Sequence, residues 1–327
     1  MKTKTALLIT LVTIAFVGGC KKNEDDEAPT PSPTPTAPNA NVFQELFTDN
    51  VADATQSFAV SAAVGGEVIA TQGTKLIFEP NAFTHWDGSP VTGAVEVSVV
   101  EALTMRDMIW LNKQTVGNDN GTLRMLRSGG AINVYASQGA SLLKITQSGL
   151  VVQIPTTVGD PAMQLFSGTE DADGTMIWDL IDSTSVTVDA PYYTAPTYTY
   201  PYYFNYTLNA ANLQWTNCDY LYNYPNPTVV TATIPSGQST DSTLVWIAFP
   251  TENAVVSLHH STGQAFTIPP GYLGVPVGLQ AVFVGLKQTA TGYTSSFNTV
   301  TISASMNVPM TFSPTTLAQF ESELDAL

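Results

Sequence analysis

Positive charge and cysteine are both scarce in this chain. Its 327 residues carry 11 lysines and arginines against 27 aspartates and glutamates, which gives a formal net charge of −16. A nucleic-acid backbone requires a cationic protein surface, so this balance argues against nucleic acid as a partner. The presence of only two cysteines excludes a disulfide-dense scaffold and the usual structural zinc sites.

Motifs of the common enzyme classes are missing as well. The chain contains no Gly-x-Ser-x-Gly elbow, no phosphate-binding loop and no dinucleotide fingerprint. The sequence therefore predicts that the protein is not an enzyme, and it indicates no catalytic residue and no cofactor. Charged residues make up 12% and hydrophobic residues 44%, which is too apolar for a disordered chain and enough to build sizeable cores in two domains.

The first 19 residues are typical of a secretory signal peptide. Two lysines form a cationic start, residues 6–17 are apolar, and two glycines precede Cys20. The apolar run is too short to span a bilayer. We therefore expect cleavage before Cys20.

The residues Val17-Gly18-Gly19-Cys20 resemble a bacterial lipobox. In proteins with that motif the cysteine thiol receives diacylglycerol and becomes the new N-terminus, so the resemblance implies lipidation of Cys20. Each buried acyl methylene adds about 0.8 kcal/mol to membrane attachment. The alternative is an ordinary signal peptide followed by a chance cysteine.

Residues 20–41 are interpreted as a tether. Residues 21–27 (KKNEDDE) end in an acidic run that resembles the surface-export signal of Bacteroidota lipoproteins, and a solvated spacer is the simpler interpretation. Residues 28–39 are rich in Pro, Thr and Ser, which predicts an extended spacer with polyproline character. We expect a protein that is anchored in the outer membrane and displayed on the cell surface.

From residue 42 onward the hydrophobicity mostly alternates with a period of two, and β-branched and aromatic residues are enriched. This pattern predicts an all-β fold. The expected strands are residues 67–70, 75–78, 94–100, 131–136, 142–145, 150–154, 185–188, 204–208, 229–234, 243–249, 281–286 and 299–304.

Short helices are expected at residues 41–47, 104–112 and 313–327. The last should begin with Ser313 as its N-cap and Pro314 in its first turn. It carries an apolar stripe that we expect to pack on the last domain: Leu317, Phe320, Leu324 and Leu327.

We expect two Ig-like β-sandwich domains. The first covers residues 42–184, and the second covers residues 203–327 with the C-terminal helix. Residues 185–202 form a junction between them that is rich in Tyr and Pro.

Residues 65–99 show an ordered set of glycine, proline and strand motifs. Gly65-Gly66 precedes a strand, a second strand ends at Pro80, and Asn81-Ala82-Phe83 and Val95-Glu96-Val97 follow. This order resembles the module shared by ankyrins, netrin receptors and zonula occludens proteins, in which Gly is usual at the position of Asn81. The resemblance implies a β-sandwich with an interaction and scaffolding role.

Five further motifs carry a second resemblance: residues 90–93 (PVTG), 106–109 (RDMI), 128–130 (SGG), 163–166 (MQLF) and 213–219 (LQWTNCD). Together they are similar to a group of Bacteroidota outer-membrane lipoproteins. This resemblance implies a location in the envelope and no defined biochemical activity.

The histidines do not predict a metal site. His259 and His260 are adjacent, so on a strand they point to opposite faces, and His85 lies in a turn-like segment. His260-Ser261 partly resembles the self-cleavage site of the module's eukaryotic relatives. The following Thr262-Gly263 predicts a hairpin turn.

Cys218 is expected to be a buried structural thiol, because no cation lies near it in the sequence to lower its pKa. Residues 170–174 (EDADG) place alternating carboxylates before a glycine, as calcium loops do, but the remaining ligands of such a loop are missing. A solvated turn is the favoured interpretation there and at Asp119.

Tyrosine is concentrated in one stretch, where ten of the 13 lie between residues 192 and 224. A tyrosine ring with its polar tip suits sugar stacking and protein interfaces. Packing at the domain junction and along an edge strand is the simpler interpretation. The candidate ligand-binding residues are Tyr198, Tyr200, Tyr202, Tyr203 and Trp215.

We expect a non-enzymatic, lipid-anchored cell-envelope protein with a binding, adhesion or scaffolding role. Its expected partners are the membrane, through the lipid on Cys20, and a glycan or an envelope protein. One alternative is a carbohydrate-binding component of a glycan-uptake system. The other is a protein that cleaves itself at His260-Ser261.

Overall fold

The computed structural model describes residues 41–146, 149–156, 158, 160, 162–171, 174–181, 202–208 and 214–327, without the side chains of residues 41, 42 and 202–208. The predicted signal peptide, Cys20, the tether up to residue 40 and the predicted strand at 185–188 lie outside the described residues. The described residues belong to one compact unit.

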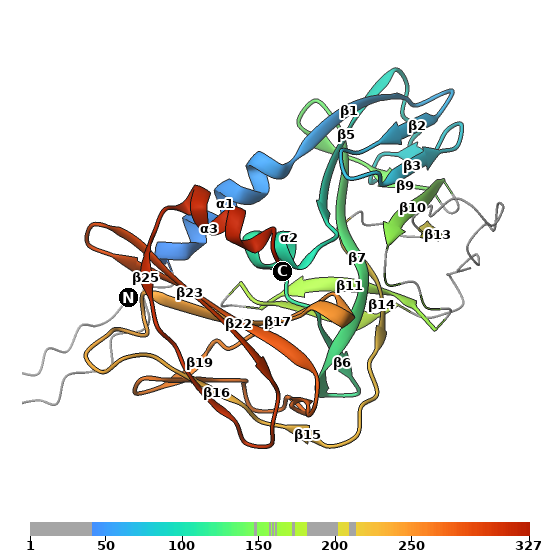
Figure 1. Ribbon diagram of the computed structural model, residues 1–327. Coiled ribbons are helices and arrows are strands. Elements are labelled where there is room, and N and C mark those ends of the chain that lie inside the picture. The colour runs from blue at the N-terminus through green and yellow to red at the C-terminus, as the bar shows by residue number, and fades with distance from the viewer. Residues whose placement is uncertain are drawn as a thin grey trace, which may run out of the picture. The chain divides into compact units, whose positions relative to one another are not determined.

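Strands dominate the described chain, which confirms the predicted all-β class (Figure 1). The first sheet is built around the long strand β7 (Thr122–Gln138). On one side of β7 lie β5 (Ala94–Ala102) and β1 (Gln56–Ser61), and β8 (Ser141–Leu142) pairs with its end. On the other side follow, in order, β14 (Trp215–Leu221), β11 (Gln164–Glu170), β12 (Met176–Leu180) and β6 (Val116–Asp119).

This sheet curls back on itself, because β6 pairs with both β12 and the start of β7. The strands β7, β14, β11, β12 and β6 therefore form a closed ring. Trp178 and Phe166 are fully buried in the same cluster as Leu126 and Met176. Strand β14 follows the predicted junction at 185–202, yet it pairs with β7 and β11, which precede that junction.

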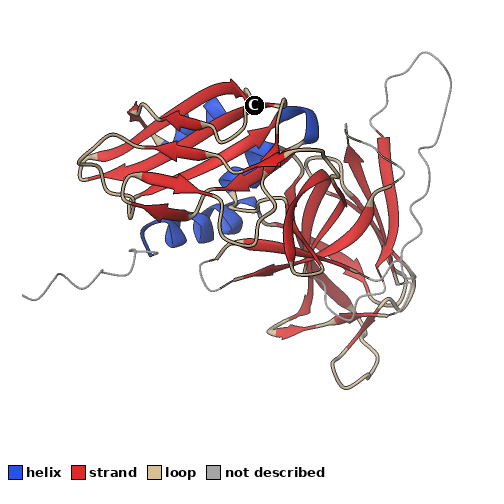
Figure 2. Ribbon diagram, turned by 90° about the horizontal axis from the view of Figure 1, so that it is seen from below, coloured by secondary structure: helices blue, strands red, loops and turns tan. Residues whose placement is uncertain are grey.

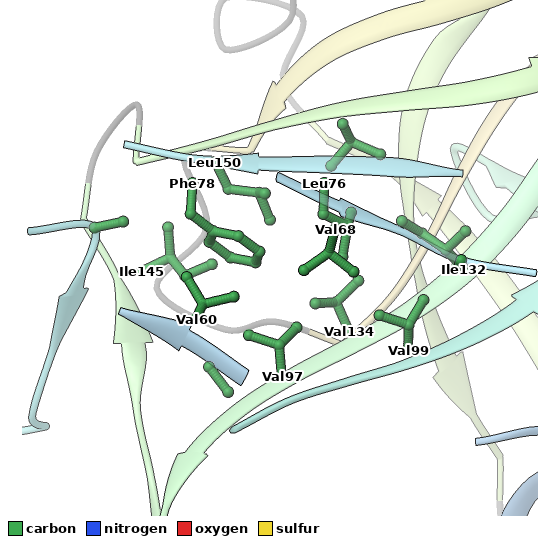
Figure 3. Close-up of a cluster of buried hydrophobic side chains, with 14 of the residues drawn as sticks. Val60, Val68, Leu76, Phe78, Val97, Val99, Ile132, Val134, Ile145 and Leu150 are labelled. Carbon is green, nitrogen blue, oxygen red and sulfur yellow. The ribbon is translucent and has the colours of Figure 1, made fainter. Parts of the chain in front are cut away.

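A four-stranded sheet faces the first one. Its order is β13 (Tyr202–Leu208), β10 (Leu150–Thr156), β3 (Lys75–Phe78) and β2 (Gly66–Ile69). Side chains alternate along a strand, so every second residue points into the space between the two sheets. Val97, Val134, Leu76, Phe78 and Leu150 meet there (Figure 3). Strands β4 (Phe83–Thr84) and β9 (Lys144–Ile145) form a separate pair.

Two further sheets make up the rest of the chain. One contains β18 (Ala254–Ser257), β17 (Thr243–Phe249), β22 (Gln280–Thr289), β23 (Gly292–Thr301) and β25 (Ser313–Thr315). The other contains β19 (His260–Thr262), β20 (Ala265–Thr267), β16 (Thr231–Thr233) and β24 (Asn307–Pro309). A short pair, β15 (Pro227–Thr228) and β21 (Val275–Pro276), and a 3-10 turn, η2 (Pro250–Glu252), complete the region.

Strand β17 is buried on both faces, which explains its unbroken apolar sequence. Val245, Ile247 and Phe249 belong to the core that the last two sheets share, whereas Trp246 and Ala248 point the other way. There they contact the helices, which lie beside one group of strands in Figure 2. These are α1 (Asn41–Ala54), α2 (Met105–Trp110) and α3 (Leu317–Leu324).

The short C-terminal helix is confirmed, but its predicted start is wrong. Residues Ser313–Thr315 pair with β23 as strand β25, so the helix begins later. Thr316 is the N-cap, and its hydroxyl accepts a hydrogen bond from the Gln319 N–H at 3.1 Å. Phe320 and Leu324 of the predicted stripe are buried against the neighbouring helices and sheet.

Residues 114–115 connect the two halves of the described chain. Thr115 N–H donates to the Val255 carbonyl at 2.8 Å, and Thr115 Oγ1 accepts from Val255 N–H at 2.9 Å. Gln114 accepts from Ser257 N–H at 2.9 Å through its side chain and donates to the Met176 carbonyl at 3.0 Å. Residues 114–115 therefore pair with backbone groups at the edge of β18, and through Met176 they connect β18 to the closed ring of β7, β14, β11, β12 and β6.

Candidate functional site

Two adjoining depressions run along α1, and we call them together the α1 groove. The first, of about 200 Å³, includes Asp241, His259 and Ser261 in its wall. The second, of about 270 Å³, lies between α1 and the first sheet and includes Asn133, Tyr135 and Trp215. Gln44, Phe47 and Asn112 line both depressions, so the two adjoin.

Helix α1 forms one wall of the groove because its apolar residues are held by the sheets. Phe43 and Phe47 are buried, and the Phe47 ring packs edge-on against Trp246 at 6.4 Å between centroids. Val51 packs against the cluster that contains Trp215. The period of about four residues between these side chains is that of one helix face, which leaves Gln44 exposed.

The end of α2 positions Lys113 in the groove. Thr104 caps the helix start through a capping box with Asp107. At the other end Asn112 is left-handed, with φ 55°, and Lys113 N–H donates to the Met108 carbonyl at 2.7 Å. Asn112 N–H also donates to Ile109, which completes a Schellman motif and turns the chain at this point.

Lys113 is a buried cation with two compensating partners. It is only 5% exposed, and its ammonium lies 2.5 Å from Glu170 Oε1. It also lies 5.3 Å from the centroid of the Trp215 ring. The carboxylate and the negative face of the ring replace the water that burial removes.

Strand β7 contributes the inner surface of the second depression. Asn133 and Tyr135 are two residues apart, so they project from one face of the strand, and Asn133 lies directly opposite Trp215. The amide of Asn133 donates to the Tyr135 hydroxyl at 3.4 Å. Asn133 is 4% exposed, and its Oδ1 has no hydrogen-bond partner among the described residues.

Trp215 is the predicted ligand-binding residue whose side chain lies in this groove. It is 7% exposed and has Lys113 against its ring, which leaves little ring surface for stacking. Tyr135, at 40% exposed, offers more. Tyr198 and Tyr200 lie outside the described residues. Tyr202 and Tyr203 lie in β13, which is an edge strand of its sheet. The structure describes their backbone but not their side chains.

Three other tyrosines of the tyrosine-rich stretch form a row. The ring centroids of Tyr220 and Tyr222 are 6.2 Å apart, and those of Tyr222 and Tyr224 are 5.5 Å apart. The Tyr224 hydroxyl donates to the Gly274 carbonyl, and burial raises the pKa of Tyr224 to about 12. Tyr224 therefore contributes to the core that contains β16 and β17.

His85 lies on a different segment from the adjacent His259 and His260. His85 lies in a tight turn in which its N–H donates to the Ser89 carbonyl at 3.0 Å. His260 and Ser261 lie in β19, and Ser261 pairs with Phe266 of β20 across the hairpin predicted at Thr262-Gly263. Among the described residues, no group of three His, Cys, Asp or Glu side chains could hold a metal ion.

The carboxylates of the two acidic turns already have partners within the protein. Asp119 forms an ion pair with Arg124 at 2.7 Å in the hairpin between β6 and β7. In the turn at residues 170–174, Glu170 pairs with Lys113, and Asp171 Oδ1 accepts from Thr175 N–H at 2.9 Å. Residues 172 and 173 of that loop lie outside the described part of the chain.

Sequence reasoning missed a buried polar network between β7 and β14. Asp219 is fully buried, and its carboxyl accepts hydrogen bonds from Gly129 N–H at 3.1 Å and from the Asn217 amide. Burial raises the pKa of Asp219 well above its usual value. Cys218, which lies between Asn217 and Asp219 in the sequence, is buried as predicted, and burial raises the pKa of its thiol too.

A signal for this network was present in the sequence. Two of the motifs behind the lipoprotein resemblance contribute to it, because residues 128–130 and the described part of the 213–219 motif meet across these two strands. Their polar residues carry the contacts, including a hydrogen bond from Ser128 Oγ to Asn217 Oδ1 at 3.3 Å. For the groove, the sequence singled out Trp215 and Glu170 separately, but no pattern connected them with Asn133 or Lys113.

Comparisons with known proteins add little. No protein-family model and no curated protein matches the chain. Among solved structures, a γ-CGTase from alkalophilic Bacillus clarkii is 10% identical, with a TM-score of 0.20 over 76% of this chain and 41% of that one. The chain thus spans less than half of that protein, and a likeness of this size carries no argument. No helix in the described residues is long and apolar enough to cross a membrane.

Proposed function

We propose that this protein is a lipid-anchored, non-enzymatic component of the outer membrane that displays a binding unit on the cell surface. The observation that carries the proposal is the order of signals in the sequence: a signal peptide, Cys20 at its cleavage point, an acidic run and a Pro-rich spacer. Helix α1 begins at Asn41, directly after that spacer.

The spacer suits display at a distance from the membrane. The 12 residues from 28 to 39, in an extended polyproline conformation of about 3.1 Å per residue, would reach about 37 Å. That length exceeds the polar region of one membrane leaflet. A binding unit on such a tether can meet a glycan or an envelope protein.

The binding unit is proposed to consist of two β-sandwiches. One apolar cluster takes its residues from the first sheet and from the sheet of β2, β3 and β10. A second takes its residues from the two sheets that contain β17 and β16. Two sheets that share one core are the basis of a sandwich, and sandwiches serve binding in many surface proteins.

The groove supports a binding role rather than a scaffold alone. It is concave, has an apolar wall made by Phe43 and Phe47, and contains polar side chains from several elements. Ligand sites combine these features. The buried acceptor of Asn133 adds a polar group that a ligand would satisfy.

Replacement of Cys20 tests the anchor. The full-length chain is produced in a bacterium that processes lipoproteins and is labelled with a palmitate analogue. We expect the wild type to carry the label and to fractionate with the membrane, and Cys20→Ala to do neither. Cys218→Ala is the matched control, because it removes the other thiol and should keep label and location. Protease added to intact cells should digest the wild type.

Two results would contradict this proposal. One is a Cys20→Ala protein that stays in the membrane fraction. The other is a wild-type protein that retains residues 1–19 and carries no lipid. Intact mass of the purified protein measures both the cleavage and the acyl chains.

A further inference from the structure

We propose that the α1 groove binds an uncharged oligosaccharide of at least two units, with Asn133 and Tyr135 as its inner contacts. This inference rests on the binding role proposed above. It concerns residues that the tyrosine-rich stretch does not contain. Four features of the groove support it: an unsatisfied acceptor, an exposed ring, the balance of charge and the presence of two adjoining depressions.

The acceptor is the side-chain oxygen of Asn133. Asn133 is nearly fully buried, and the atom has no partner among the described residues. Buried polar atoms are almost always hydrogen-bonded in folded proteins, so an exception at the wall of a cavity points to a missing donor. The Asn133 amide is already oriented by its bond to the Tyr135 hydroxyl. A sugar hydroxyl supplies the donor that the oxygen lacks.

The exposed ring is that of Tyr135. It projects from the same face of β7 as Asn133 and lines the same depression. A tyrosine ring offers an apolar face and a polar edge, and a pyranose offers C–H groups on one face and hydroxyls around its rim. Trp215, opposite Asn133, lines the same depression.

The charge of the groove disfavours an anionic ligand. Lys113 is the one Lys or Arg among the described lining residues, and both Glu170 and the Trp215 ring already engage it. Glu170 and Asp241 add carboxylates to the walls. An acidic sugar or a phosphate would therefore meet repulsion without a free cation, whereas neutral hydroxyls can donate to carboxylates.

The shape of the groove indicates a chain-like ligand. Each depression, at about 200 and 270 Å³, is smaller than the roughly 300–1,000 Å³ of pockets for drug-sized molecules. Each therefore suits one ring-sized unit. The two meet at Gln44 and Asn112, whose planar amides can donate to and accept from sugar hydroxyls. A peptide is the other class of chain ligand, and the test includes it.

The test measures binding by the full-length lipoprotein in detergent. Arrays of neutral glycans, acidic glycans and peptides are screened, and calorimetry gives Kd for the best neutral oligosaccharide. Tyr135→Ala changes an exposed residue, so the fold should survive, and we expect it to weaken binding about tenfold or more. Asn133→Ala should weaken binding as well. Trp86→Ala, which removes a 57% exposed ring on a turn outside the groove, should leave Kd unchanged.

Several outcomes would overturn the inference. These are no neutral glycan bound at millimolar concentration, a preference for acidic glycans or peptides, and unchanged affinity in Tyr135→Ala. Loss of binding in Tyr202→Ala and Tyr203→Ala with full binding in Tyr135→Ala would assign the sugar to β13 instead. Any of these can occur while Cys20 lipidation and surface display hold, so failure here is distinct from failure of the proposed function.

Discussion

Single buried side chains set the polar interior of this protein, and Asp219 is the clearest case. Its carboxyl is fully enclosed between β7 and β14, with amide donors on both oxygens and no cation in contact among the described residues. Desolvation of the charged form outweighs the hydrogen bonds from Gly129 and Asn217, so the folded pKa is raised.

This burial predicts a dependence of stability on pH. Because the pKa of Asp219 is higher in the folded state than in the unfolded state, folding retains a proton on it. Its contribution is fully present below the unfolded value of 3.8 and is lost as pH rises toward the folded pKa. Above about pH 4, the free energy of unfolding of Asp219→Asn should fall less steeply with pH than that of the wild type. The two slopes should differ by up to about 1.4 kcal/mol per pH unit.

Urea unfolding at several pH values measures this difference. Asp49→Asn, at an exposed position of α1, is the matched control and should follow the wild-type curve. Parallel curves for the wild type and Asp219→Asn would contradict the assignment of a retained proton to Asp219.

Individual strands and helices reveal where local sequence signals suffice. Strands β3 and β17 match the predicted residues 75–78 and 243–249 at both ends, because alternation or unbroken burial is visible locally. Helix α1 extends to Ala54, beyond the predicted residue 47. Thr48, Asp49 and Asn50 are weak helix formers, but the Asn50 amide donates to the Trp110 carbonyl at 2.8 Å and Val51 packs on the sheet.

The entry to β2 depends on a glycine for a reason that the structure makes specific. Gly65 has φ 74°, and a Cβ there would clash with the Phe78 carbonyl. Gly88 has a similar φ of 83° but open space around it. Gly88→Ala should therefore cost only the backbone strain, about 1 kcal/mol.

Gly65→Ala should cost about 3 kcal/mol or more, because strain and overlap with backbone add. Chemical unfolding of the two variants measures the difference directly. Equal losses for both would show that the contact with Phe78 relaxes without cost, contrary to this expectation.

The described chain as a whole is held together by pairings across its halves. Strand β14 joins the sheet of the N-terminal half, and Gln114 bonds to Ser257 on one side and Met176 on the other. These contacts bury polar groups that would lack partners if the halves separated.

We therefore expect heat to unfold the described part of the protein in one calorimetric transition. Gln114→Ala should lower the unfolding free energy by about 2 kcal/mol, since it leaves the Ser257 N–H and the Met176 carbonyl unpaired. Gln319→Ala, at an exposed position of α3, is the control and should have little effect. Two well-separated transitions in the wild type would contradict this coupling.

The sequence alone determined the all-β class and many strand positions, because period-two patterning and apolar cores are local properties of a chain. It also predicts an anchor at Cys20, because a signal peptide is a local pattern too. The tertiary structure decided which strands pair and what lines the α1 groove. Asn133, Glu170, Lys113 and Trp215 are brought together by β7, β11, α2 and β14. Non-local pairing depends on the packing free energy of the whole chain, which no local window of sequence contains.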